Sequence, residues 1–361
     1  MTVIATFGID NLPVLIGDLL ISRETGSATS VGLPTIGHYN SGETANNDGK
    51  PVGLSQKVNI INDKLAIAWA GSQIHAKYVL KEIKRIVGTT SVDYDRIKRI
   101  LESLPREVFK DLSICGIFAN NGECGAFHFN AVEMYTENVG DIYAAGSGLH
   151  HIYEVLEMPM EYKFIEPSEN PMALPIGKAI AICNLLLGAE IRSRTTLNNL
   201  YGGAFEIAIT DGHTVKKIGD ILHIFMNAEI GNGTEISGSF YSRMIKQTYI
   251  GRDLLMRSTQ TSTDEKGNTN LDEQDMHIVM PVYKNGRTSK YSINDLPDMN
   301  STILCINLFV SKEGNPLFVK SRVKHAAIDH QAVQFDGGKD LSGIKLDTEF
   351  FSDFLKDIPK E

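Results

Sequence analysis

The chain has 361 residues, of which 42% are apolar and 22% charged, the composition of an ordinary globular protein rather than a disordered or fibrous one. Its 44 acidic residues outnumber its 35 basic ones, and the resulting net charge of −9 argues against nucleic acid as the main partner, because phosphate binding needs clustered positive charge. The opening segment MTVIATFGID lacks the basic and apolar regions of a secretory signal, and no window reaches the roughly 18 apolar residues of a membrane span, so we expect no membrane partner.

The first 71 residues predict strands interrupted by one insertion. Two apolar runs, 2–8 and 13–22, are joined by Ile9-Asp10-Asn11-Leu12 and predict a β-hairpin. Segment 23–53 is rich in Gly, Asn, Ser and Thr, which predicts a long loop or an insertion. Strands are expected again at 57–61 and 65–70, with a turn at Asn62-Asp63.

The middle of the chain predicts two pairs of helices separated by strands. Ser72 is a candidate N-cap for a first helix, and the second is expected at 94–104. Strands at 112–118 and 124–129 flank Asn120-Asn121-Gly122, which supplies the positive φ angles of a tight hairpin. A third strand near 142–144, helices at 149–158 and 172–191, and a hairpin over 204–218 turning at Asp211-Gly212 complete this part. The order differs from strict βαβ alternation and favours an α+β fold of two stacked antiparallel sheets with a helical layer on each side.

The pattern changes beyond about residue 225. Residues 238–257 predict a helix, and the polar segment 259–276 predicts a loop or disorder. Strands are expected at 277–283, 301–310 and 316–322. We therefore expect two parts, a core over 1–225 and a small β-rich C-terminal addition over 226–361.

Thr2 is the first candidate for chemistry. An N-terminal threonine hydrolase uses the hydroxyl of its first residue as nucleophile and that residue's own α-amine as base, and the amine's ordinary pKa of about 7.7–8.0 suits this task. Removal of Met1 would give Thr2 a free amine. Alternatively, Thr2 is merely the second residue of an edge strand.

Four segments, in order, carry a family resemblance. They are VLIGDLLIS over 14–22, KVNIINDKLAIAWAG over 57–71, YAAGSG over 143–148 and GGAFEIAI over 202–209. Asp18 follows Thr2 by 18 − 2 = 16 positions, and Gly71 follows Lys57 by 71 − 57 = 14. In motif and spacing, residues 2–220 resemble the proteasome β-subunit family, including its bacterial proteasome-like homologues, within the Ntn-hydrolase superfamily.

The resemblance implies a four-layer αββα sandwich and five catalytic residues. Thr2 would attack the scissile carbonyl and form an acyl-enzyme. Lys57 would lower the pKa of the hydroxyl, and Asp18 would pair with Lys57. The N–H of Gly71 would supply the oxyanion hole, and Ser147 would hydrogen-bond the Thr2 amine.

The resemblance also implies a substrate site, an assembly and a location. Ser22, Trp69 and Gln73 would bind substrate, and the Trp69 indole would make the pocket shallow unless it is simply a core aromatic. The substrate would be a peptide or a small amide, with no metal or organic cofactor. We expect a cytoplasmic homo-oligomer, a ring or a spiral.

Several features depart from the family and leave alternatives open. About two dozen extra residues near 29–52 separate Asp18 from Lys57. Asn198 and Tyr201 stand where the family has an aspartate and a serine that position the amine. The chain could therefore be a non-catalytic structural or partner-binding protein of the same fold, or a small-molecule Ntn amidohydrolase.

Two other kinds of site are disfavoured. His150 and His151 follow Ser147, but a G-x-S-x-G nucleophile elbow is missing, so a serine hydrolase is not expected. His325, Asp329 and His330 match no standard metal-ligand spacing, and the four cysteines form no C-x-x-C pair.

Overall fold

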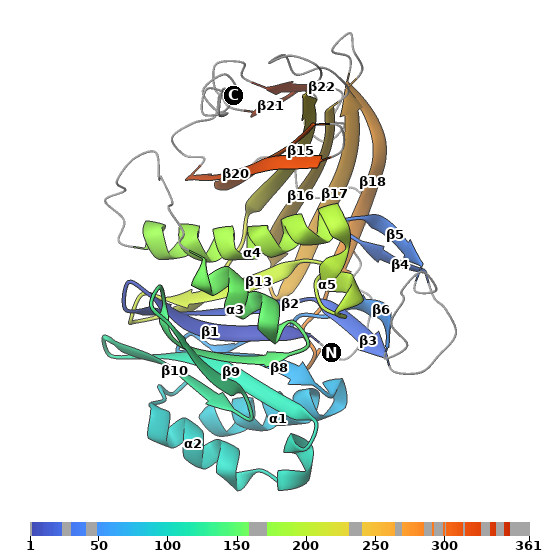
Figure 1. Cartoon of the computed structure of the whole chain (residues 1–361). Helices are drawn as coiled ribbons and strands as arrows, with labels where there is room; N and C mark the ends of the chain where they lie inside the picture. Colours follow the sequence, from blue (N-terminus) through green and yellow to red (C-terminus); the bar gives the residue numbers. More distant parts are fainter. Residues whose placement is uncertain are drawn as a thin grey trace.

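The computed structural model describes residues 2–23, 30–40, 49–158, 172–230, 240–263, 269–284, 291, 299, 301–312, 315–325, 333–336 and 343–346. The fold is α+β, with several antiparallel sheets and few helices (Figure 1). The helices are α1 (Gln73–Val87), α2 (Tyr94–Ser103), the 3₁₀ helix η2 (Arg106–Phe109), α3 (Leu149–Glu157), α4 (Ala173–Ser193) and α5 (Thr195–Asn198).

The first sheet carries the N-terminus in its centre. Its six strands run antiparallel in the order β11-β12-β1-β2-β13-β14. They are β1 (Val3–Ile9), β2 (Leu12–Asp18), β11 (Val132–Thr136), β12 (Gly140–Gly146), β13 (Phe205–Thr210) and β14 (Val215–Ile218). The β1–β2 hairpin confirms the prediction, and Asp10 and Asn11 make its turn with φ of 51° and 65°.

The second sheet packs face to face on the first. Its antiparallel order is β10-β9-β8-β7, from β7 (Val58–Asn62), β8 (Leu65–Gly71), β9 (Leu112–Asn120) and β10 (Glu123–Phe129). Small buried side chains such as Ala66 and Ala68 lie between the two sheets, together with Ile4 and Leu15 of the first. Small residues at these positions allow the sheets to approach closely.

The helices cover the outer faces of both sheets. Helices α1 and α2 bury their apolar stripes against β8 and β9, and α3 and α4 cover the other face of the first sheet (Figure 1). The Ser72 Oγ caps α1 by accepting a hydrogen bond from the His75 N–H at 3.4 Å, which confirms the predicted helix start. The predicted α2, α3 and α4 are also confirmed.

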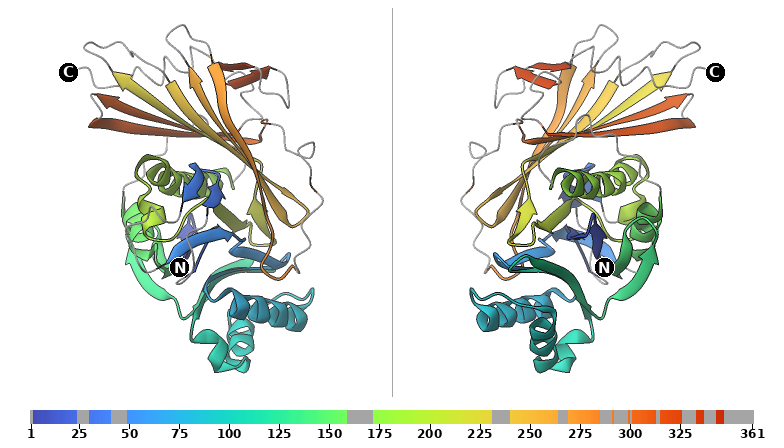
Figure 2. Two further views of the ribbon diagram at one scale, coloured as in Figure 1. Left: turned by 90° about the vertical axis from the view of Figure 1, so that its right-hand side faces the viewer. Right: turned by 90° about the vertical axis from the view of Figure 1, so that its left-hand side faces the viewer.

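A third sheet follows in the chain and packs across α4 (Figure 2). Its order is β18-β17-β16-β15-β19-β20, and its strands are β15 (Ile221–Ile230), β16 (Phe240–Ile250), β17 (Asp253–Thr263), β18 (Thr269–Val279), β19 (Ile303–Lys312) and β20 (Asn315–His325). Only the β15–β19 pair is parallel among the described strand pairs of this sheet. Phe225 and Phe309 belong to the same apolar cluster as Leu186 of α4. The C-terminal sheet therefore shares a core with the rest of the molecule.

The sequence prediction fails between 238 and 276. The helix expected over 238–257 is wrong, because β16 and β17 form an antiparallel hairpin there. The loop expected over 259–276 is also wrong, since β17 continues to Thr263 and β18 begins at Thr269. Both strands carry polar residues on buried positions, among them Arg243 and Ser258, and these hide the period-two pattern of a strand.

The insertion between Asp18 and Lys57 is partly structured. Three two-stranded sheets complete the described part of the fold: β3 (Leu20–Arg23) with β6 (Lys50–Leu54), β4 (Ser30–Leu33) with β5 (Gly37–Asn40), and β21 (Val333–Asp336) with β22 (Gly343–Leu346). Leu33 and Tyr39 of the β4–β5 hairpin are buried in a small cluster with Leu197 of α5. The insertion thus packs beside the segment that leads into β13.

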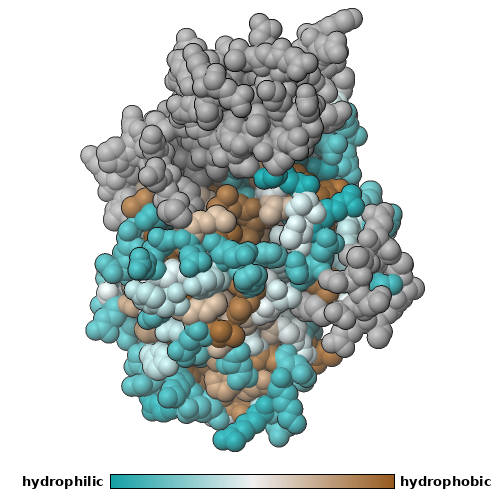
Figure 3. Space-filling view, viewed as in Figure 1, coloured by the Kyte–Doolittle hydropathy of each residue, from teal (hydrophilic) through white to brown (hydrophobic). Residues whose placement is uncertain are grey.

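Helix α4 alone among the described helices is long and apolar enough to cross a membrane, contrary to the expectation that no window qualifies. In the structure 67% of that window is buried inside the protein, as in the core helix of a soluble fold. Hydrophilic residues cover most of the described part of the face in Figure 3, with hydrophobic residues showing between them in small areas.

Candidate active site

Thr2 and Asp18 meet because β1 and β2 are antiparallel neighbours. Ile4 pairs with Gly17, so the start of β1 lies beside the end of β2. The Thr2 hydroxyl donates a hydrogen bond to Asp18 Oδ1, which also accepts from the Val3 N–H at 3.1 Å. The other carboxylate oxygen accepts from the Gly202 N–H at 2.9 Å. These three donors anchor a fully buried carboxylate directly on the predicted nucleophile.

Lys57 lies next to this pair, immediately before β7. A Cβ on Gly17 would stand 3.0 Å from the Lys57 Cβ, so the glycine leaves room for the lysine. The Lys57 Nζ lies 4.1 Å from the centroid of the Trp69 ring, a cation–π contact. The predicted charge pairing acts through space, since Asp18 uses its oxygens on Thr2, Val3 and Gly202.

Burial sets the protonation of both charged groups. It lowers the pKa of Lys57 from 10.5 to about 8, against the opposing charges of Asp18 and Glu206. It also raises the pKa of Asp18, which the Lys57 charge and the hydrogen bonds from Thr2, Gly202 and Val3 oppose. The lysine can therefore exchange its proton near neutral pH, a property suited to proton transfer.

Ser147 directly follows β12, which flanks β1 on the side opposite to β2, and it lies beside Thr2. Gly146 pairs with Val3 and adopts φ of 104°, and a Cβ there would stand 2.0 Å from the Thr2 carbonyl oxygen. The Ser147 hydroxyl and the Gly148 N–H both donate to that oxygen, at 3.4 and 3.2 Å. The structure thus brings Ser147 to Thr2, and its action on the amine stays a prediction.

Gly71 ends β8 directly before helix α1. Its φ is 106°, and a Cβ would stand 2.0 Å from the Asp111 carbonyl oxygen, so only glycine fits here. Gly71 is exposed and the following amide, that of Ser72, donates to Asp111 at 2.7 Å. The oxyanion role of Gly71 stays a prediction.

The three predicted substrate-binding residues differ in their surroundings. Trp69 is 1% exposed and packs in the cluster below α1, where its indole N–H donates to the Gln56 carbonyl at 3.2 Å. Ser22 is half-buried in β3 beside Pro51. Gln73 is exposed at the first turn of α1. Of these three residues, Trp69 is the one with a described contact to Lys57, the cation–π contact given above.

Glu190 is a second carboxylate at this site that the sequence analysis missed. It is fully buried on α4 and accepts hydrogen bonds from Thr35 of the insertion, from Thr196 at 2.7 Å and from the Gly203 N–H at 3.0 Å. Burial raises its pKa to about 7. Adjacent amides of Gly202 and Gly203 therefore bind two different carboxylates, Asp18 and Glu190.

Asn198, Tyr201 and the histidine pair singled out in the sequence have different surroundings. Asn198 is exposed at the end of α5. The Tyr201 hydroxyl lies 2.9 Å from His151 Nδ1. His150 is exposed, and its Nε2 lies 3.2 Å from the Glu154 carboxylate.

The cluster of Thr2, Asp18 and Lys57 is closed to solvent. Thr2 and Asp18 are 0% exposed and Lys57 is 1% exposed. One cavity of about 520 Å³ is lined by residues including Arg252, Tyr283 and Lys284, and another of about 370 Å³ by Tyr135, His150 and others. Neither is lined by Thr2. The Thr2 hydroxyl is therefore not accessible from solvent in this structure.

Metal binding has no candidate within the described ranges, where no group of three or more His, Cys, Asp and Glu side chains gathers. Asp329 and His330 lie outside the described residues. All four cysteines are free, and three of them are buried.

The candidate site thus contains the buried side chains of Thr2, Asp18 and Lys57. The Ser147 hydroxyl and the Gly148 N–H donate to the Thr2 carbonyl, and the Gly202 N–H donates to Asp18. No protein-family model matches the chain, and comparison with curated proteins finds no significant match. The resemblance to proteasome β-subunits therefore stays a prediction from the motifs and their spacing.

Proposed function

We propose that the chain is an N-terminal-nucleophile hydrolase of the threonine type, acting on a peptide or a small amide. One observation carries the proposal: residues far apart in sequence, Thr2, Asp18 and Lys57, meet in one buried cluster with the hydroxyl bound to the carboxylate. A buried lysine beside a hydroxyl is a recurrent way to activate an oxygen nucleophile.

The proposed fold is the four-layer αββα sandwich of the Ntn-hydrolases. In this proposal helices α1 and α2, the two stacked sheets, and helices α3 and α4 would be the layers in that order, and the apolar clusters that join these elements support it. The C-terminal sheet is an addition to this sandwich.

In the proposed reaction, removal of Met1 frees the α-amine of Thr2. The amine takes the hydroxyl proton, and Oγ bonds to the substrate carbonyl carbon. The Lys57 ammonium stabilises the negative charge that develops on the Thr2 Oγ, and the Gly71 N–H donates a hydrogen bond to the oxyanion formed from the substrate carbonyl. The C–N bond then breaks as the leaving amine takes the proton, and water hydrolyses the ester to release the acid and regenerate Thr2.

A second candidate is a non-catalytic member of the same fold. The complete burial of Thr2 and Asp18 favours it, because a nucleophile must be reached by substrate. The two candidates differ in one property, the accessibility of Thr2 in the mature protein.

Hydrolysis by the mature protein tests the proposal. Peptide and small-amide fluorogenic substrates are assayed with the unaltered protein, Thr2→Ala, Lys57→Met and the control Lys98→Met, whose lysine is exposed on α2. We expect Thr2→Ala to lose all turnover, Lys57→Met to lose at least about 100-fold, and the control to keep it. Turnover that survives Thr2→Ala overturns the mechanism.

We also propose that the protein is a cytoplasmic homo-oligomer, a ring or a spiral. Light scattering on the purified protein tests the assembly, and a mass equal to the 39.8 kDa monomer at micromolar concentration would contradict it.

A further inference from the structure

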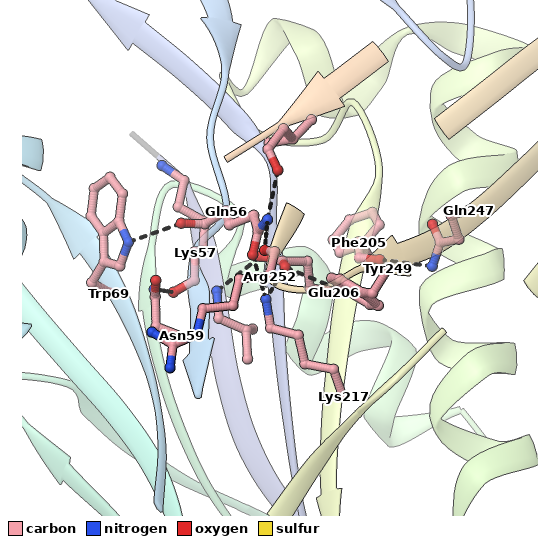
Figure 4. A network of polar contacts seen from close by, with 12 residues as sticks. Gln56, Lys57, Asn59, Trp69, Phe205, Glu206, Lys217, Gln247, Tyr249 and Arg252 are labelled. Carbon is pink, nitrogen blue, oxygen red and sulfur yellow. Dashed lines mark hydrogen bonds and ion pairs between the residues drawn. The ribbon is translucent and has the colours of Figure 1, made fainter. Parts of the chain in front are cut away.

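Glu206 forms a buried acidic centre behind Lys57. It lies on β13 opposite Gly17, and it is 0% exposed. Its Oε2 accepts from the Val58 N–H at 3.0 Å, and its Oε1 accepts from the Tyr249 hydroxyl at 3.0 Å and from the Lys217 ammonium (Figure 4). Val58 directly follows Lys57, so Glu206 fixes the strand that carries the lysine.

The residue before Lys57 is held by the C-terminal sheet. Gln56 is 1% exposed, and its side-chain amide donates to the carbonyls of Arg252 at 2.8 Å and Val279 at 2.6 Å. Its side-chain oxygen accepts from Lys217 at 2.6 Å. Lys57 is thus flanked on both sides by residues that depend on strands β16 to β18 or on Glu206 (Figure 4).

The charges around Lys57 come from four elements. Asp18 of β2 and Glu206 of β13 carry the negative charges, and Lys217 of β14 carries a second positive charge beside Glu206. Tyr249 of β16 binds Glu206 and stays neutral because burial raises its pKa. Two cations thus face two carboxylates, and removal of Glu206 leaves an excess of positive charge in a buried volume.

We propose that Glu206 is a positioning residue that holds the strand carrying Lys57 beside the Thr2–Asp18 pair, and that Tyr249 of the C-terminal sheet holds Glu206 in place. The proposal rests on the proposed function for the role of Lys57. It gives the C-terminal sheet a part in the site: β16 and its neighbours complete the surroundings of the lysine.

The first test measures the titration of Lys57 through stability and needs no activity. The folded-state pKa of Lys57 lies below its unfolded value, so its contribution to stability rises with pH between about 8 and 10.5. The free energy of unfolding in urea is measured from pH 6 to pH 11. The contribution of Lys57 is the part of its pH dependence that is lost in Lys57→Met. In Glu206→Gln, loss of the negative charge lowers the folded-state pKa of Lys57 by about one unit, so the rise in stability begins at a pH lower by the same amount.

The second test measures the rate at which a threonine-reactive β-lactone labels Thr2 across the same pH range. The alkaline fall in labelling follows deprotonation of Lys57, and we expect Glu206→Gln to move its midpoint toward acid by about one unit. Tyr249→Phe keeps the ring and deletes the donor, and it should move the midpoint in the same direction by less. Tyr135→Phe, at a 64% exposed position, is the control and should leave it unchanged.

The outcomes separate the two proposals. A shift in the unfolding window without any lactone adduct on the unaltered protein supports the link between Glu206 and Lys57 and overturns the threonine mechanism. An adduct on the unaltered protein with an unmoved midpoint in Glu206→Gln overturns the positioning role and leaves the mechanism standing. If Glu206→Gln does not fold, Tyr249→Phe decides: an unmoved midpoint in that variant contradicts the proposal.

Discussion

The Thr2 hydroxyl donates a hydrogen bond to the fully buried carboxylate of Asp18, and this hydrogen bond should contribute to the stability of the fold. Thr2→Ala removes a donor from a buried acceptor, which we expect to cost about 1–3 kcal/mol in the free energy of unfolding. Urea unfolding measures it.

Thr6 is a matched control on the same strand. It is equally buried, but its hydroxyl has no hydrogen-bond partner within the described part of the chain. Thr6→Val should therefore leave stability unchanged or raise it by about 1 kcal/mol. Equal destabilisation by Thr2→Ala and Thr6→Val would contradict the bond between Thr2 and Asp18.

Glu190 predicts a pH dependence of stability. Its folded pKa of about 7 lies above its unfolded value of 4.5, so the folded protein binds more protons between these values. Its contribution is complete below pH 4.5 and is lost as the pH rises through 7, by up to about 3 kcal/mol.

Glu190→Gln should remove this slope from the urea-unfolding free energy measured between pH 4.5 and 7. Glu102→Gln, at an exposed position of α2, should keep it. The same slope in all three proteins would show that Glu190 titrates as it does in the unfolded chain.

At the scale of elements, strand β12 positions Thr2 through Gly146. Gly146→Ala would place a Cβ 2.0 Å from the Thr2 carbonyl oxygen and would strain a backbone with φ of 104°. We expect a loss of more than about 2 kcal/mol in unfolding free energy, and a loss of Thr2 labelling by the β-lactone.

Gly140, at the other end of β12, is a control that distinguishes backbone strain from a steric clash with Thr2. Its φ is 72°, and a Cβ would meet nothing within 4 Å. Gly140→Ala should cost about 1 kcal/mol and leave the labelling rate unchanged. Equal losses of labelling in both variants would show that Gly146 does not place Thr2.

The elements that the sequence predicted correctly are those with local signals. Ser72 caps α1, and Asn121 and Gly122 turn the β9–β10 hairpin with φ of 52° and 94°. Strands β16 and β17 and most of β18 were mistaken for helix and loop because buried polar residues occur on both of their faces, and the consecutive residues Arg257, Ser258 and Thr259 of β17 are all 0% exposed. Hydrophobic periodicity cannot reveal a strand whose inward positions are polar.

The candidate site was predicted in part for the same physical reason. Thr2, Asp18 and Lys57 were found through spacing, whereas Glu190 and Glu206 act through contacts with distant segments. Each is a single acid within an apolar run, and that is the signal that would have marked them, because a lone buried charge requires partners.

At the scale of the whole molecule, the C-terminal sheet is expected to be required for folding. The predicted boundary at 225/226 falls inside β15, and Ile245, Ile303 and Phe309 share a core with α4. A chain ending at residue 220 would expose this face of α4 and lose the Tyr249 and Gln56 contacts.

We therefore expect the 1–220 fragment to lack a cooperative urea transition, by circular dichroism, while the full chain keeps it. A cooperative transition in the fragment, at the midpoint of the full chain, would show that the first two sheets fold alone.

The mass of the N-terminal peptide of the protein from its native host, with and without a threonine-reactive β-lactone, tests the central claim most directly. The threonine mechanism predicts that Met1 is absent and that the lactone adds to Thr2, which requires the buried hydroxyl to become accessible in the mature protein. A retained Met1 with no adduct would contradict it and leave the chain as a non-catalytic protein of this fold.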